Sequence, residues 1–322
     1  MTTLNTLPSN DMFRYIRRTA IASAATWLGA IGLLSFSSSA SGIAVAPVDF
    51  SVVQSSNWSG YVDTTSSNTQ TFTNVVGSWQ VPAVTAPASG STYSAFWVGL
   101  DGWGNSTVEQ LGTSSFYTSS GAYYYAWYEM FPQLSIPITT MAVSPGDWMN
   151  ASVQYQGNNN YRLTMEDTTT GSLFTIDQTS NFGLRSSAEW IAESPGINGS
   201  LSSLANYGTT TFTGASATMN GTDTGGISSF ANYSAVQLVS SNGGLDSTPS
   251  LLNAAGNGFN VAVGGTAPPG TTLTATGNVG MLATTEFGTP ASSVPEPGML
   301  PLMSLAGLLL LVRRNKKPVA NH

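Results

Sequence analysis

The sequence contains no cysteine, and its one histidine, His322, is the last of its 322 residues. These absences exclude a cysteine nucleophile, a zinc site built on histidines, and a serine nucleophile activated by histidine. We therefore expect no metal site and no cofactor, and any hydrolytic chemistry has to use carboxylates and amides. Two stretches carry such groups among aromatic and apolar residues, at positions 97–110 and 188–193.

Basic residues are few and unevenly placed. Of nine lysines and arginines, only Arg162 and Arg185 lie between residues 45 and 290, where fourteen acidic residues leave a formal charge of −12. Two cations cannot neutralise a phosphate backbone, so we expect no nucleic-acid partner. Because protonated carboxylates no longer repel one another, we expect greatest stability in a mildly acidic medium. The alternative is an acidic surface that only keeps the protein soluble.

The first 44 residues have the features of an export signal. Three arginines between positions 14 and 18 precede a largely apolar run over 21–36, and small residues follow up to position 44. A membrane anchor is the alternative, but the run is short and ends in small polar residues. We therefore predict a signal peptide over 1–44 and an exported protein.

The last 29 residues carry a second targeting pattern. Pro295-Glu296-Pro297 precedes an apolar stretch over 299–312, which a basic segment over 313–317 follows. This order resembles the PEP-CTERM sorting signal of Gram-negative bacteria. The resemblance implies transient membrane contact, cleavage by an exosortase-type enzyme, and a final location outside the cell or at its outer envelope. An ordinary tail anchor is the alternative, and it predicts the same side of the membrane.

Between the two signals the sequence predicts an all-β body. No window of helical length has a clean apolar period of 3.6 residues, whereas short alternating runs recur between turn residues. These runs occupy residues 93–100, 122–131, 151–155, 173–176, 188–192, 209–212, 235–239 and 259–263. Many short strands with glycine-rich turns indicate an antiparallel β-sandwich or jelly roll over 45–265. Residues 266–293 are then a final strand and spacer, and residues 294–322 form the sorting signal.

Strand parity suggests where a site would lie. In residues 188–193, Glu189, Ile191 and Glu193 share one face, and the small and apolar residues between them share the other. In the same way Glu129 shares a face with Trp127 and Phe131, which lie two residues before and after it. Carboxylates among aromatics on one sheet face indicate a lined groove. The alternative is that both glutamates are ordinary outer-face residues.

Gln110 is the second candidate group. Its parity places it with Val108, on the face opposite Glu109 and Leu111. A glutamine in a strand is more often a structural hydrogen-bonding residue than a catalytic one. The residues alone therefore predict a carboxylate-lined groove without a unique mechanism.

Seven short stretches, in order and at similar spacing, together resemble the glutamic peptidases, or eqolisins, first known from fungi. They lie at residues 56–61, 76–82, 96–102, 110–112, 126–132, 188–191 and 205–208. Each stretch alone is weak evidence, but seven in sequence are specific, and they cover nearly the whole body. The resemblance implies a concanavalin-like β-sandwich of two sheets that cleaves protein or peptide substrates in a groove on one face. It implies Gln110 and Glu189 as the catalytic pair, and it implies that a further set lines or supports the groove: Trp58, Trp97, Asp101, Trp127 and Glu129.

These roles follow from the chemistry of the side chains. Ionised Glu189 acts as a general base on the attacking water, and with an ordinary pKa near 4.3 it stays competent in acid. Gln110 donates an amide N–H to the developing oxyanion. A neutral amide also avoids the repulsion that two neighbouring carboxylates would suffer.

The sequence departs from the fungal pattern in three ways, and two other functions remain open. It has no cysteine for disulfides, little room for a long propeptide before Asn57, and Tyr125 where we expect an aspartate. One alternative is a carbohydrate-active or lectin-like jelly roll that uses Glu109 with Glu189 as an acid–base pair. The parity of Glu109 argues against that pair. The other alternative is a non-catalytic protein of the extracellular matrix.

Overall fold

The computed structural model describes residues 51–197 and 200–265. The predicted signal peptide over 1–44, the predicted final strand and spacer over 266–293, and the predicted sorting signal over 294–322 lie outside the described residues. Within the described ranges, no helix has the length and apolar character needed to cross a membrane.

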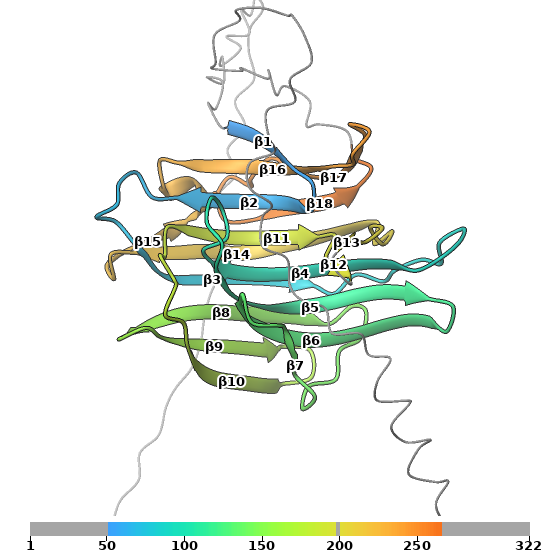
Figure 1. Ribbon diagram of the computed structural model, residues 1–322, viewed down its shortest axis with the longest axis horizontal. Helices are drawn as coiled ribbons and strands as arrows, with labels where there is room; N and C mark the ends of the chain where they lie inside the picture. Colours follow the sequence, from blue (N-terminus) through green and yellow to red (C-terminus); the bar gives the residue numbers. More distant parts are fainter. Residues whose placement is uncertain (1–50, 198–199, 266–322) are drawn as a thin grey trace, which may run out of the picture. The chain divides into compact units, whose positions relative to one another are not determined.

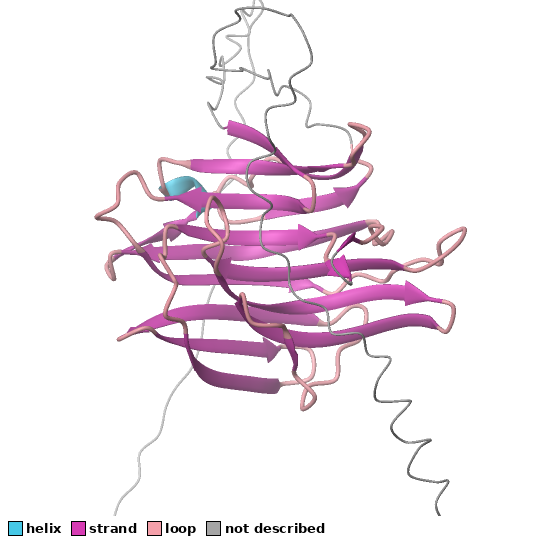
Figure 2. Ribbon diagram, viewed as in Figure 1, coloured by secondary structure: helices cyan, strands magenta, loops and turns pink. Residues whose placement is uncertain are grey.

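The described residues form a β-sandwich whose only helix in those ranges is the single 3-10 turn η1 (Ile227–Ser229) (Figure 2). One layer, the front layer, contains in spatial order β1 (Ser51–Ser55), β16 (Tyr233–Val239), β2 (Trp58–Thr64), β11 (Ser187–Glu193), β4 (Thr92–Leu100), β5 (Val108–Thr118), β6 (Gly121–Phe131) and β7 (Ile136–Pro137). The back layer contains β10 (Ser172–Thr179), β9 (Asn160–Asp167), β8 (Trp148–Gly157), β3 (Phe72–Gln80), β14 (Thr209–Met219), β18 (Phe259–Val263) and β17 (Leu245–Pro249). Two small additions are β15 (Asp223–Gly226), which pairs with β14, and the separate ribbon of β12 (Gly196–Ile197) and β13 (Ser200–Leu201).

The two layers are continuous in hydrogen bonding, because β16 of the front layer pairs with β17 of the back layer (Figure 1). The named strands pair antiparallel except for β1 and β16, which run parallel. The predicted all-β sandwich is therefore confirmed, and each of the eight predicted runs lies in a strand. The alternation of residues did not identify the following strands: β1, β2, β3, β7, β9, β12, β13, β15 and β17.

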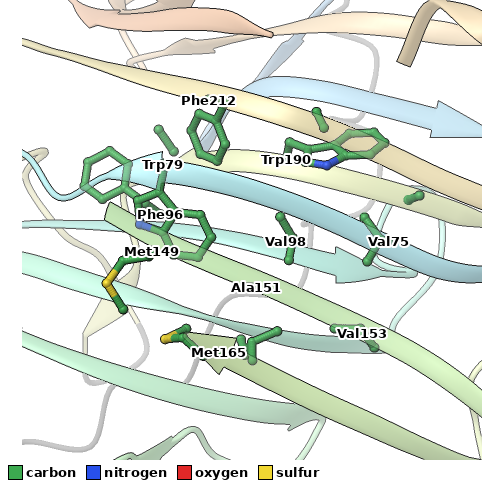
Figure 3. Close-up of a cluster of buried hydrophobic side chains, with 14 of the residues drawn as sticks. Val75, Trp79, Phe96, Val98, Met149, Ala151, Val153, Met165, Trp190 and Phe212 are labelled. Atoms are coloured by element: carbon green, nitrogen blue, oxygen red, sulfur yellow. The ribbon is translucent and has the colours of Figure 1, made fainter. Parts of the chain in front are cut away.

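The main core fills the space between the layers, as Figure 3 shows for residues of both. On β11, Trp190 and its two alanine neighbours at 188 and 192 face this core, as strand parity predicted. Two buried indoles also link the layers through hydrogen bonds. Trp190 Nε1 donates to the Val76 carbonyl at 2.7 Å, and Trp79 Nε1 donates to Thr113 Oγ1 at 2.9 Å. Each indole thus combines apolar burial with a satisfied N–H group.

One carboxyl group on the core side is unusual. Asp63 of β2 is fully buried, and neither of its carboxylate oxygens has a hydrogen-bond partner in the described structure. It lies between Ala188 of β11 and Tyr233 of β16 in the strand register. Because burial disfavours the charged form, the pKa of Asp63 rises to about 9. The folded protein therefore keeps this carboxyl protonated over the acidic and neutral range.

This carboxyl makes stability depend on pH. Between the pKa of an unfolded aspartate, about 4, and about 9, only the folded state keeps the proton. The contribution of this proton to the free energy of unfolding is therefore fully present below about pH 4. It falls by about 1.4 kcal/mol per pH unit as pH rises toward the folded pKa. We expect Asp63→Asn to reduce the fall in unfolding free energy between about pH 5 and pH 8, measured by urea denaturation.

Asp177→Asn is the matched control. Asp177 is exposed and paired with Arg162, which lowers its pKa, so it is ionised in both the folded and the unfolded state between about pH 5 and pH 8. Its loss should therefore leave the fall in unfolding free energy over this range unchanged. If Asp63→Asn and the unchanged protein lose stability equally with rising pH, Asp63 is not the source of the dependence.

Candidate active site

The predicted catalytic residues lie in one row across the front layer. In the strand register, Glu189 of β11 is opposite Gly99 of β4, Gly99 is opposite Gln110 of β5, and Gln110 is opposite Glu129 of β6. Residues that are directly opposite in neighbouring strands project from the same face of a sheet. The row lies on the face away from the main core, which we call the site face. Gln110, Glu129 and Glu189 therefore share one face.

Gly99 leaves space between the two candidate groups. Neighbouring strands are about 4.8 Å apart, so the Cα atoms of Glu189 and Gln110, two strands apart, are separated by about 10 Å. A Cβ atom at position 99 would lie 3.0 Å from the Trp97 ring and 3.1 Å from the Cβ of Gln110. The missing side chain lets Glu189 and Gln110 approach a common position above β4.

Glu129 fixes the orientation of the Gln110 amide. Gln110 Nε2 donates a hydrogen bond to Glu129 Oε2 at 2.7 Å, and both side chains are buried. Gln110 Oε1 is buried without a hydrogen-bond partner in the described structure. The amide thus keeps one acceptor, and the second hydrogen on Nε2, for another molecule.

Glu189 is the second member of the pair. It is fully buried, and neither carboxylate oxygen has a hydrogen-bond partner among the described residues. Burial raises the pKa of Glu189 well above 4.5, and the nearby charge of Asp101 adds to this rise. The Ser187 side chain and the Trp103 backbone N–H act in the opposite direction. The expected pKa near 4.3 is therefore wrong for this structure, because it ignored the loss of hydration.

Three predicted tryptophans form an apolar cluster on the site face. Trp58, Trp97 and Trp127 are all fully or almost fully buried there, away from the main core. The edge of Trp58 packs on Trp97 with ring centroids 4.8 Å apart. In the next row of the register, Trp97 and Trp127 flank Gly112, where a Cβ atom would lie 2.6 Å from Trp97. These indoles therefore lie on the same face as Gln110 and Glu189.

Glu193 contacts this cluster, although the sequence predicted for it only a shared strand face with Glu189. Its carboxylate accepts hydrogen bonds from Trp97 Nε1 at 2.7 Å and from Asn57 Nδ2 at 3.3 Å. The signal for it was the shared parity with Glu189, four residues earlier. Glu193 therefore holds Trp97 in place beside the row of candidate groups.

Asp101 supports the site from the end of β4. Its carboxylate accepts hydrogen bonds from the backbone N–H groups of Arg185 at 2.5 Å and Ser186 at 2.8 Å, and from Asn105 Nδ2 at 2.9 Å. It thereby fastens the segment that leads directly into β11 and Glu189. The Arg185 guanidinium stacks on the Tyr155 ring at 3.8 Å. Of the two predicted roles, lining or supporting the groove, these contacts fit support.

Glu109 and Tyr125 lie on opposite faces of the front layer. Glu109 pairs with Leu100 in the register and projects from the core side, opposite to Gln110. It is fully buried there near Tyr161, and burial raises its pKa to about 8. Glu109 and Glu189 thus project from opposite faces, so they do not form the acid–base pair of the carbohydrate alternative. Tyr125, where an aspartate was expected, lies on the site face and packs against the tryptophan cluster.

The sequence matches a known protein family over most of the described structure. The pattern of the Peptidase A4 family matches residues 56–252, a range that includes Gln110 and Glu189. Aspergillopepsin-2 from Aspergillus niger is 31% identical over 193 residues, which are 53% of this chain and 67% of that protein. Scytalidopepsin B from Scytalidium lignicola is 28% identical over 141 residues, which are 43% of this chain and 51% of that protein.

Solved structures of similar fold agree with this match. The scytalido-glutamic peptidase bound to a transition-state analogue inhibitor has a TM-score of 0.56 and 23% identity, over 65% of this chain and 98% of that one. The eqolisin SCP-B bound to the tripeptide Ala-Ile-His has a TM-score of 0.51 and 22% identity, with the same coverage. At these identities the likeness concerns the fold alone. Because the family pattern spans more than half of the chain, this protein belongs to the Peptidase A4 family and is a glutamic endopeptidase.

Proposed function

We propose that this protein is an exported acid endopeptidase in which Glu189 and Gln110 together hydrolyse the peptide bonds of protein or peptide substrates. The observation that carries the proposal is the single row formed by Glu189, Gly99, Gln110 and Glu129. It places a carboxylate and an amide on either side of a residue without a side chain. In the proposed reaction the water molecule and the substrate carbonyl lie between them.

The reaction uses one proton twice. Glu189 takes a proton from water while the water oxygen bonds to the carbonyl carbon of the substrate, which gives a tetrahedral oxyanion. The Nε2 hydrogen of Gln110 that is not bonded to Glu129 donates to this oxyanion, and Oε1 accepts from the attacking water. Glu189 then passes its proton to the leaving nitrogen as the C–N bond breaks, which restores the carboxylate.

Glu129 acts as a positioning residue for Gln110. Its carboxylate holds one Nε2 hydrogen at 2.7 Å, so the amide cannot turn its oxygen toward the oxyanion. Asp101 and Glu193 support the same arrangement from two sides, by fastening the start of β11 and by holding Trp97. The tryptophans on the site face exclude water from the reacting groups, which strengthens their interaction with developing charge.

The pH range follows from the buried carboxyls. Glu189 has to be ionised to act as a base, and its raised pKa moves the acidic limb of activity above about pH 4.5. Asp63 and Glu109 are protonated in the folded state, so the free energy of unfolding falls as pH rises toward their pKa values of about 9 and about 8. Action in a mildly acidic medium satisfies both conditions.

Export and sorting are proposed on the sequence features of the two ends. The signal pattern over 1–44 and the Pro295-Glu296-Pro297 pattern within 294–322 support delivery to the cell surface or outer envelope of a Gram-negative bacterium, or release from it. The C-terminal pattern supports transient membrane contact and an exosortase-type partner. Mass spectrometry of the mature protein tests this by locating its two ends.

Digestion of a denatured protein tests the activity itself. Casein or haemoglobin is incubated with the protein at acid pH in the presence of pepstatin, which inhibits aspartic peptidases. Cleavage that persists with pepstatin supports the proposal. Inertness toward protein combined with sugar binding would instead support the lectin-like alternative.

We expect Glu189→Gln to abolish turnover, because Glu129, the other carboxylate beside Gln110 on the site face, is held by its hydrogen bond to the Gln110 amide. Glu109→Gln is a matched control, since it makes the same chemical change on the opposite face of the neighbouring row. Its effect on kcat/KM should be mild. Measurable turnover by Glu189→Gln, or an inactive but folded Glu109→Gln protein, would contradict the assigned roles.

Gln110→Ala removes the proposed donor to the oxyanion. Loss of one such donor costs about 2.7–4 kcal/mol in the barrier, which lowers kcat by about 100- to 1000-fold. Steady-state kinetics on a peptide substrate measure this change. Near-normal kcat would show that Gln110 has only a structural role.

Gly99→Ala tests the space between the pair. The added methyl group would press on Gln110 and Trp97 at 3.0–3.1 Å, and a misplacement of catalytic groups by about 1 Å costs about 100-fold in rate. We expect kcat/KM to fall at least tenfold while the thermal unfolding midpoint shows that the protein remains folded. Full activity in the folded variant would mean that substrate and water do not use this space.

A further inference from the structure

An open groove of about 960 Å³ lies beyond the catalytic row, toward the β1 edge of the front layer. Leu238 of β16 and Ser55 of β1 line it and are opposite each other in the register. Val236, two residues before Leu238, pairs with Gly60, which pairs with Ile191 of the site face. Leu238 and Ser55 therefore project from the same face as Glu189, on strands of the same layer.

Trp103 connects this groove to the catalytic base. Its side chain lines the groove, and its ring lies 6.2 Å from that of Trp58 in the tryptophan cluster. Its backbone N–H lies near enough to Glu189 to favour the charged carboxylate. One residue thus borders both the reacting group and the groove.

The lining of the groove selects by chemistry. Apolar side chains, among them Leu201, Leu204 and Leu238, alternate with serine hydroxyls. Among the described residues that line it, Asp246 is the one charged side chain. The groove therefore suits a large uncharged side chain of a peptide, tolerates a basic one, and disfavours an acidic one.

The spacing of the strands gives the position of that side chain in a substrate. β16 is two strands from β11, which corresponds to about 10 Å, and Leu238 lies about 13 Å further along β16 than Ser234, which is level with Glu189. The two displacements combine to about 16 Å, so an extended peptide, which advances about 3.3 Å per residue, reaches the groove about five residues from the cleaved bond.

We propose that this groove binds the substrate side chain about five residues from the cleaved bond, and that Trp103 determines its preference for large apolar residues. The proposal rests on the proposed function, because it places the cleaved bond between Gln110 and Glu189. It goes beyond that function by naming the type of residue preferred at one substrate position and the side chain, Trp103, that contacts this residue.

Two peptide series test the proposal. Each keeps one cleavable core, and each carries Leu, Ala or Glu about five residues from the cleaved bond, on its amino side in one series and on its carboxyl side in the other. A truncated peptide that ends before this position is the reference. We expect one series to show a kcat/KM order of Leu over Ala over Glu.

Trp103→Ala should lower the ratio of kcat/KM for the Leu peptide to that for the truncated peptide by about tenfold, the scale of a lost apolar contact. Trp103→Phe should restore most of the ratio. Trp148→Ala, at a half-exposed tryptophan of β8 in the back layer, is the matched control and should leave the ratio as it is. A ratio that Trp103→Ala does not change, or that Trp148→Ala lowers equally, would overturn the assignment of the groove.

Failure of the groove and failure of the catalytic pair give different results. If the pair is wrong, Glu189→Gln cleaves every peptide as the unchanged protein does. If only the groove is wrong, Glu189→Gln is inactive and Trp103→Ala shows the same preference as the unchanged protein.

Discussion

The register of the strands in the front layer is the constraint on which the active site depends. A slip of one residue in β5 would replace Gln110 on the site face by Glu109. Glu189 would then share that face with the carboxylates of both Glu109 and Glu129. Close packing holds the register: a Cβ atom at Gly60 would lie 2.1 Å from the Trp190 carbonyl oxygen of β11. The Trp190 indole in turn bonds to the back layer through Val76. Core packing and the alignment of the reacting groups are therefore one property of the molecule.

The sequence predicted those parts of the structure in which the two faces of a strand differ in polarity. In β11 and β6 the alternation of carboxylates with apolar residues was enough to assign Glu189 and Glu129 to a common kind of face. Strand β2 is almost entirely buried on both faces, so its sequence shows no alternation, and its length was not predictable from pattern. The sequence also could not show that Gly99 separates Glu189 from Gln110, because this depends on pairing between distant segments.

Electrostatic expectations changed more than the fold did. The excess of acidic residues predicted stability in mild acid through repulsion at the surface. The structure gives the same direction by a different cause, because Asp63 and Glu109 are buried and remain protonated in the folded state. For Glu189 burial reverses part of the expected advantage, since a base with a raised pKa has to lose its proton before it can act. Exposure, which sequence does not report, decides all three.

The two arginines of the described body have a consequence for survival among other peptidases. An enzyme that cuts after arginine or lysine needs a flexible segment that can extend into its cleft. Arg162 lies within the ladder between β8 and β10, and the backbone N–H and carbonyl of Arg185 are bonded to Asp101 and Phe72. Between residues 51 and 265 the chain has no lysine, so trypsin-like enzymes find two bonds and neither is free. Within residues 51–265 the folded protein therefore presents trypsin-like enzymes with no loosely held cleavage site.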